Sequence, residues 1–183
     1  MDELLKIKLL KRKFLSANYI KEFLDNYKKF HETGLAAFNA YQRYRRERPE
    51  FEPNDTLLRE EDFWENRVCP NFEGNLGAMR EVEALISRND HRTNMYLDGL
   101  AGDFRGISRG FDGIEENFMD VATPEMRKEY LRLYKLTIRK AMIIEATING
   151  WWNEGEILDE EITGPIDEQE LLNYLKPDED YIL

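Results

Sequence analysis

The stretch that decides the fold is residues 76–118, LGAMREVEALISRNDHRTNMYLDGLAGDFRGISRGFDGIEENF. When each residue is advanced by 100°, its apolar side chains fall in one band of the helical wheel. That band contains Met79, Val82, Leu85, Ile86, Thr93, Tyr96, Leu97, Leu100, Phe104, Ile107, Phe111, Ile114 and Phe118. Because the phase is kept over the whole stretch, the pattern predicts a single long helix or two nearly collinear helices.

Glycines form a second stripe beside this apolar band, with two arginines among them. The stripe is made of Gly99, Gly102, Gly106, Gly110 and Gly113, and the arginines are Arg105 and Arg109. Each glycine costs about 1 kcal/mol relative to alanine inside a helix, so a loop over residues 98–113 is an alternative. If the stretch is helical, the stripe is a groove that admits another helix, within the chain or across a homo-oligomer, or a flat ligand.

Two further stretches read as long helices. Residues 3–47 predict one long or gently kinked helix, in which Gly34 marks a possible break and Pro49 ends the pattern. Residues 124–150 predict another, because Thr123 is a good N-cap, Pro124 suits the first helical position and Gly150 is a natural terminator.

The remaining segments are shorter. Residues 49–74 predict a connector with a short helix that Pro70 and Gly74 end, and residues 151–183 predict a tail with a short helix at about 167–175. We therefore expect an all-α, elongated helical bundle with about three main helices, divided into a bundle domain (1–153) and an acidic tail (154–183). One further long helix can hardly cover the apolar faces of 3–47 and 76–118, so we also expect a homo-oligomer, most simply a dimer.

Charge is distributed very unevenly along the chain. The net charge of −11 combines 12 basic and 6 acidic residues in 1–48 with 1 basic and 11 acidic residues in 154–183. The candidate basic surface consists of Lys11, Arg12, Lys13, Arg43, Arg45 and Arg46. It has three interpretations: a solvated helix face, a contact with the acidic tail, or a nucleic-acid surface. The negative total makes nucleic acid the least favoured of the three without excluding it.

A polar cluster is the candidate for chemistry. Glu145 falls at the centre of the apolar stripe of 124–150, while Asn89 lies inside the apolar band of 76–118 and His91 at its edge. A buried carboxylate must be paired, protonated or close to solvent. The three residues therefore predict either a polar pair that sets helix register or a catalytic carboxylate with a raised pKa.

The sequence lacks the residue patterns that other kinds of catalytic or metal site require. Neither His31 nor His91 follows a glutamate by three positions, which a carboxylate-bridged di-metal bundle requires, and Cys69 is the sole cysteine. We assign no catalytic residue, metal or cofactor.

The N-terminus does not resemble a secretory signal and no apolar run approaches about 18 residues, so we expect a cytoplasmic protein without a membrane span.

These observations predict a non-enzymatic, cytosolic protein-interaction protein. It would be an adaptor, inhibitor or assembly component that presents helical surfaces and an acidic tail to a protein partner. One alternative is a small-molecule-binding or enzymatic bundle with its site at the Gly99–Gly113 groove or around Glu145. Another is nucleic-acid binding through the basic first helix.

Overall fold

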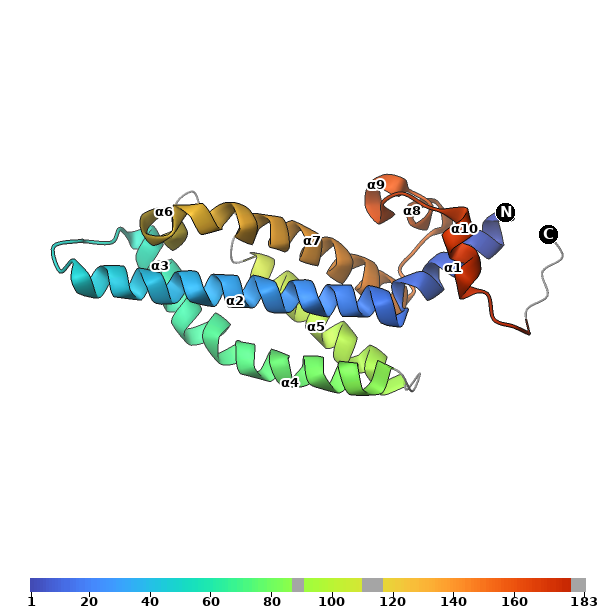
Figure 1. Cartoon of the computed structure of the whole chain (residues 1–183), viewed down its shortest axis with the longest axis horizontal. Coiled ribbons are helices and arrows are strands. Elements are labelled where there is room, and N and C mark those ends of the chain that lie inside the picture. Colours follow the sequence, from blue (N-terminus) through green and yellow to red (C-terminus); the bar gives the residue numbers. More distant parts are fainter. Residues whose placement is uncertain (87–90, 110–116, 179–183) are drawn as a thin grey trace.

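The computed structural model describes residues 1–86, 91–109 and 117–178, with the backbone alone at 108 and 109. Over these residues the chain is helical and contains no strand. Four long helices run along the molecule: α2 (Ala17–Glu47), α4 (Cys69–Leu85), α5 (His91–Arg109) and α7 (Pro124–Asn149) (Figure 1). The all-α helical bundle is therefore confirmed.

Shorter helices connect and flank the long ones. In chain order they are α1 (Glu3–Phe14), α3 (Asp55–Phe63), α6 (Phe118–Ala122), α8 (Glu154–Ile157), α9 (Glu160–Thr163) and α10 (Glu168–Leu171). A π-helical turn, Trp64–Val68, joins α3 to α4, and a 3₁₀ turn, Leu172–Tyr174, follows α10.

The prediction of one helix, or two collinear helices, over 76–118 is wrong. Helices α4 and α5 pack side by side and run antiparallel (Figure 1). Periodicity could not show this, because both helices face the same core and keep the same apolar phase whether or not the chain turns back. The alternative of a loop over 98–113 is also wrong for 98–109, which is helical, while 110–113 lie outside the described residues.

The first predicted helix divides, but not at Gly34. Helix α1 ends at Phe14, and the Ser16 hydroxyl caps α2 by accepting a hydrogen bond from the Tyr19 amide at 3.3 Å. Gly34 lies inside the unbroken helix α2, and the Trp64 indole packs directly on it. A Cβ at Gly34 would overlap that indole and lie 3.0 Å from the Tyr130 ring.

Pro70 and Gly74 do not end the connector helix as predicted. Helix α3, the π-helical turn and α4 follow one another without interruption from residue 55 to 85. The π turn shifts the hydrogen bond of the Cys69 amide to the Trp64 carbonyl. This local change of register places Pro70 in the first turn of α4, where its missing N–H is tolerated.

Residues 124–150 behave as predicted. Helix α7 ends at Gly150, whose left-handed φ of 67° turns the chain so that the Trp151 amide also reaches the Ala146 carbonyl. Thr123 occupies the N-cap position, but its buried hydroxyl has no hydrogen-bond partner among the described residues.

The main core is aromatic and lies between the four long helices. The Phe30 ring stacks on Tyr130 with centroids 4.4 Å apart and meets Phe104 edge-on at 5.1 Å. The Trp64 and Phe118 rings meet edge-on at 5.2 Å. These contacts join α2, α5, α6, α7 and the π turn into one cluster.

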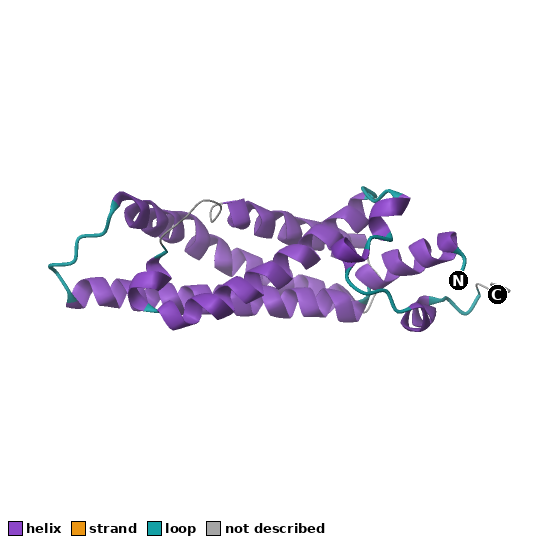
Figure 2. Cartoon of the chain, turned by 90° about the horizontal axis from the view of Figure 1, so that it is seen from above, coloured by secondary structure: helices purple, strands orange, loops and turns teal. Residues whose placement is uncertain are grey.

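A second, smaller core lies at one end of the molecule, where α1 and the tail meet (Figure 2). It contains Leu5, Ile7, Leu9, Leu10 and Phe14 of α1 with Ile143, Ile157 and Leu171. The apolar face of α1 is therefore covered by residues of the same chain. This removes much of the uncovered apolar surface from which we expected a dimer.

Candidate functional site

An apolar groove separates the C-terminal half of α7 from the segment that follows it. Its volume is about 530 Å³, and we call it the α7–tail groove. It is lined by Ile138, Arg139, Met142, Ile143, Ala146, Trp151, Trp152, Glu156 and Ile162. All of these residues are apolar except Arg139 and Glu156, so the groove offers a hydrophobic floor with two charged groups.

The end of α7 shapes one side of this groove. After the turn at Gly150, the Trp151 amide also donates to the Ala146 carbonyl at 2.9 Å. The Trp152 indole N–H donates to the Thr147 hydroxyl at 2.9 Å, and its ring stacks on Phe14 with centroids 6.3 Å apart. Trp152 is thereby fixed against the second core, whereas Trp151 remains 57 % exposed at the rim.

The opposite wall is formed by α8 and α9, which are held in place at several points. Asn153 and Glu156 form a reciprocal capping box at the start of α8, and Ile157 is fully buried in the second core. The Arg139 guanidinium donates a hydrogen bond to the Glu161 carbonyl, which ties α9 to α7. The groove is consequently part of the folded chain and needs no partner to form.

Apolar side chains are unusually exposed around this groove. Met142 is 55 % exposed and Ile162 38 %, and with Trp151 they come from both sides of the groove. A group of exposed apolar side chains is typical of an interaction site, whereas isolated ones need no explanation.

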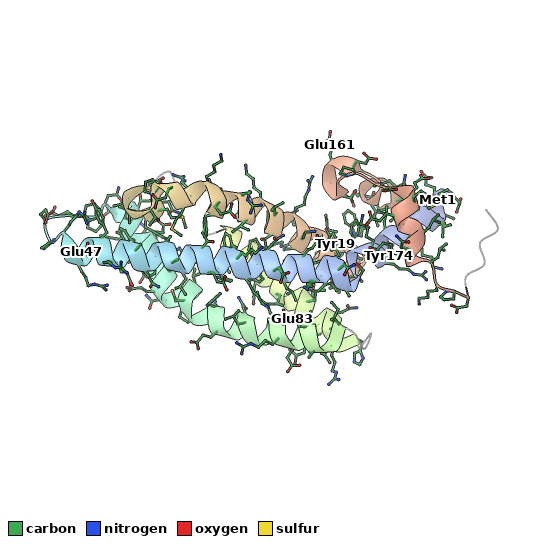
Figure 3. All side chains as sticks on the ribbon, in the orientation of Figure 1. Met1, Tyr19, Glu47, Glu83, Glu161 and Tyr174 are labelled. Atoms are coloured by element: carbon green, nitrogen blue, oxygen red, sulfur yellow. The ribbon has the colours of Figure 1, made fainter. Side chains whose placement is uncertain are left out.

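Glu156 is the acidic residue of the groove lining, and the tail segment around it is rich in carboxylates. Glu154, Glu156, Asp159, Glu160 and Glu161 fall within eight residues that contain no lysine or arginine. Glu161 projects from α9 away from the bundle (Figure 3). Within the described part of the chain, no ion pair involves the carboxylates of Glu154, Glu160 or Glu161.

The predicted glycine stripe does not form a close helix contact among the described residues. Gly99, Gly102 and Gly106 lie in α5, and a Cβ added at any of them would meet nothing within 4 Å. Gly110 and Gly113 lie outside the described residues, as does the side chain of Arg109.

Gly102 and Gly106 do line a second cavity, of about 280 Å³, which we call the polar cleft. The other lining residues are Phe63, Arg67, Val68, Asn71, Asn75, Asp103 and Ile107. Asn75 is buried and donates to the Tyr27 hydroxyl at 3.0 Å. Burial raises the pKa of Asp103 above its usual value. The cleft therefore combines an apolar side with polar groups from α4, α5 and the π turn.

The predicted cluster of Glu145, Asn89 and His91 does not assemble as a unit. Glu145 instead pairs with Arg105, whose Nε lies 3.2 Å from Oε2, and this ion pair joins α5 to α7. His91 is exposed at the start of α5, fourteen residues or roughly 21 Å along the helix from Arg105. Asn89 lies outside the described residues. A helical wheel places Glu145 on the buried face of α7, but it cannot identify the residue of another helix that lies opposite.

The basic residues of α1 contact the acidic tail. Lys13 Nζ lies 2.8 Å from a Glu170 carboxylate oxygen, and Lys6 Nζ lies 3.3 Å from Glu168. Arg12 donates to the Tyr174 carbonyl at 3.2 Å, and Lys11 is exposed. Of the three interpretations of the basic surface, the structure shows the contact with the tail for Arg12 and Lys13.

The arginines at the end of α2 lie far from α1. Arg45 forms an ion pair with Glu61, while Arg43 and Arg46 are exposed. The 31 residues of α2 span about 46 Å, and Met1 and Glu47 mark opposite ends of the molecule (Figure 3). The two groups of basic residues therefore belong to distant surfaces.

The sequence interpretation missed the buried Glu60 and the exposed Trp151. Glu60 is 3 % exposed; its Oε2 accepts a hydrogen bond from the Phe118 amide at 3.0 Å, and burial raises its pKa to about 7. Its spacing from Leu57 and Trp64 places it on the buried face of α3, which was the available signal. For the α7–tail groove, the available signal was a tryptophan, Trp151, directly after the residue that ends the helix, Gly150.

No family model, curated protein or solved structure matches this chain. In the described ranges, no helix has the length and apolar character needed to cross a membrane. The same residues contain no group of three or more side chains suited to hold a metal ion. The α7–tail groove and the polar cleft are therefore interpreted from their own chemistry.

Proposed function

We propose that this chain is a non-enzymatic protein-interaction protein that binds a segment of a protein partner in the α7–tail groove. The observation that carries the proposal is the exposure of Met142, Trp151 and Ile162 around one preformed apolar groove. Tryptophan and methionine are enriched at protein interfaces, where burial of their large side chains supplies much of the binding energy. An adaptor, inhibitor or assembly component would use such a surface.

The acidic tail contributes in two ways to this proposal. Residues 154–162 form one wall of the groove, and residues 168–174 attach the tail to α1. Removal of residues 154–183 would uncover the second core as well as the groove, since Ile157 and Leu171 are fully buried there. Point substitutions at the groove are therefore a sharper test than deletion of the tail.

Affinity capture from native lysate with three immobilised proteins tests the proposal. The first is the unmodified chain, the second carries Met142→Gln and Trp151→Gln, and the third is a control with Leu58→Gln and Met95→Gln. The control residues are 45 % and 63 % exposed and do not line the groove. We expect partners that the unmodified chain and the control retain and the groove variant loses. Identical captured proteins for all three would refute the proposal.

We also propose that the chain forms a homodimer and that it is located in the cytoplasm. If a second copy occupied the groove, light scattering at micromolar concentration would give a dimer for the unmodified chain and a monomer for the groove variant. A monomer in both cases would contradict dimerisation. Fractionation of the source cells, with the chain recovered outside the cytoplasmic fraction, would contradict the location.

The polar cleft supports a second candidate function, the binding of a small polar ligand. Its volume of about 280 Å³ lies just below the usual range for drug-sized ligands, and Arg67, Asn75 and Asp103 offer groups of both charges. A Gly106→Leu variant, whose side chain would enter the cleft, provides the control for a thermal-shift screen of metabolites. A ligand that stabilises the unmodified chain but not this variant would support the candidate.

A further inference from the structure

We infer that the segment that occupies the α7–tail groove is a short amphipathic helix whose polar edge carries lysine or arginine facing residues 154–161. The inference rests on the proposed function and specifies the chemistry of the partner. Its two parts, the helical form and the positive charge, are supported by different features of the groove.

The helical form follows from the backbone of the groove walls. The long wall of the groove is α7, whose N–H and C=O groups from Ile138 to Ala146 lie inside the helix and are paired within it. An extended peptide would bring unpaired backbone groups into an apolar groove, which costs free energy because no partner replaces water. A helix satisfies its own backbone and presents only side chains, as in other helix-in-groove complexes.

The length of the groove also suits a helix. Its lining residues on α7 run from Ile138 to Ala146, a rise of eight residues or about 12 Å along the axis. That is slightly more than two helical turns, which is enough for anchors at positions i, i+3 or i+4, and i+7. Trp151 at the rim would pack against an apolar anchor of the bound helix.

The positive charge follows from the rim. Arg139 is the basic residue of the lining, and its guanidinium already bonds the Glu161 carbonyl. The tail side contributes Glu156 to the lining, and the same segment carries Glu154, Glu160 and Glu161, which belong to no ion pair within the described part of the chain. An acidic partner would meet like charges here, whereas the aliphatic stem of a lysine or arginine can cover Trp151 while its head reaches a carboxylate.

Selection from a displayed library of random 16-residue peptides tests the inference on the full-length chain. Binders are kept when they bind both the unmodified chain and the Leu58→Gln, Met95→Gln control but lose at least roughly tenfold in affinity against the Met142→Gln, Trp151→Gln variant. We expect these groove-dependent peptides to be enriched in lysine and arginine at helical spacing and to gain helical circular dichroism on binding.

A charge series separates local from global electrostatics. The rim variant Glu154→Gln, Glu160→Gln, Glu161→Gln removes three of the five negative charges of residues 154–161. Its control, Glu52→Gln, Glu73→Gln, Glu81→Gln, changes the net charge equally at exposed positions outside the groove. We expect the rim variant to weaken groove-dependent peptides severalfold more than its control, and to reduce the salt dependence of binding.

The outcomes distinguish the inference from the function on which it rests. Groove-dependent peptides with the average charge of the library, or equal effects of the two charge variants, would overturn the basic partner while leaving the groove a protein-binding site. Peptides that bind without gaining helix would overturn the helical form. If no peptide depends on Met142 and Trp151, the proposed function fails along with the inference.

Discussion

At the scale of single residues, two glycines of the bundle have opposite surroundings. Gly34 lies under the Trp64 indole, where a Cβ would overlap the ring, whereas a Cβ at Gly106 would meet open space. Both residues are helical and neither has a positive φ, so local conformation does not distinguish them. The difference lies entirely in tertiary contact.

We expect Gly34→Ala to destabilise the protein by about 1–3 kcal/mol. Overpacking against Trp64 and Tyr130 outweighs the gain of about 1 kcal/mol in helix propensity. Urea unfolding followed by circular dichroism measures the change. A variant as stable as the unmodified chain would show that Trp64 does not pack on α2 as described.

We expect Gly106→Ala to stabilise the protein by about 0.5–1 kcal/mol. The methyl group has room, and alanine loses less backbone entropy than glycine when a helix forms. The same urea titration provides the measurement, and Gly34→Ala serves as its matched contrast. Destabilisation by Gly106→Ala would mean that a contact outside the described residues requires this glycine.

Glu60 predicts a pH dependence of stability. Its pKa of about 7 in the folded state exceeds the usual value of 4.5, so the folded state binds the proton more tightly than the unfolded state. Stability should therefore fall as pH rises from about 4.5 to 7, by up to about 3 kcal/mol. In Glu60→Gln, which can still accept from the Phe118 amide, this contribution should be absent.

The unmodified chain must be compared with Glu60→Gln because His31 changes the pH dependence of stability in the opposite direction. Burial lowers the pKa of His31 to about 4, so its neutral form stabilises the protein and that stability is lost as pH falls from 6.5 toward 4. Subtracting the curve of Glu60→Gln from that of the unmodified chain cancels the His31 contribution. A difference independent of pH between 4 and 8 would contradict the assignment to Glu60.

At the scale of elements, the Arg105–Glu145 ion pair connects α5 to α7. We expect Arg105→Gln and Glu145→Gln each to reduce stability, with a coupling of about 0.5–1 kcal/mol in a double-mutant cycle. Arg105 is 37 % exposed in its side chain, so solvent screens the pair and keeps this coupling modest. Additive effects of the two substitutions would show that the pair does not stabilise the contact between the helices.

At the scale of the whole molecule, the tail and α1 form one structural unit through the second core. A chain that ends at residue 153 should keep the main core but lose amide-exchange protection in α1, because Ile157 and Leu171 no longer cover Leu5 and Leu9. Hydrogen exchange measured by mass spectrometry resolves the two regions. Full protection of α1 in the shortened chain would show that residues 1–153 form a domain without the tail.

The sequence by itself determined that the chain is helical, where α7 begins and ends, and which face of α4 and α5 is buried. Apolar spacing, Pro124 and Gly150 act within a few residues of themselves, so their effects can be predicted without knowing the fold. Only the tertiary structure decided that α4 and α5 lie side by side, that Glu145 meets Arg105, and that the tail covers α1 and walls the groove. Periodicity specifies the angle at which each side chain lies around its helix axis. Contacts between helices depend in addition on where the chain turns back. The apolar phase does not reveal that turn, because α4 and α5 keep the same phase on both sides of it.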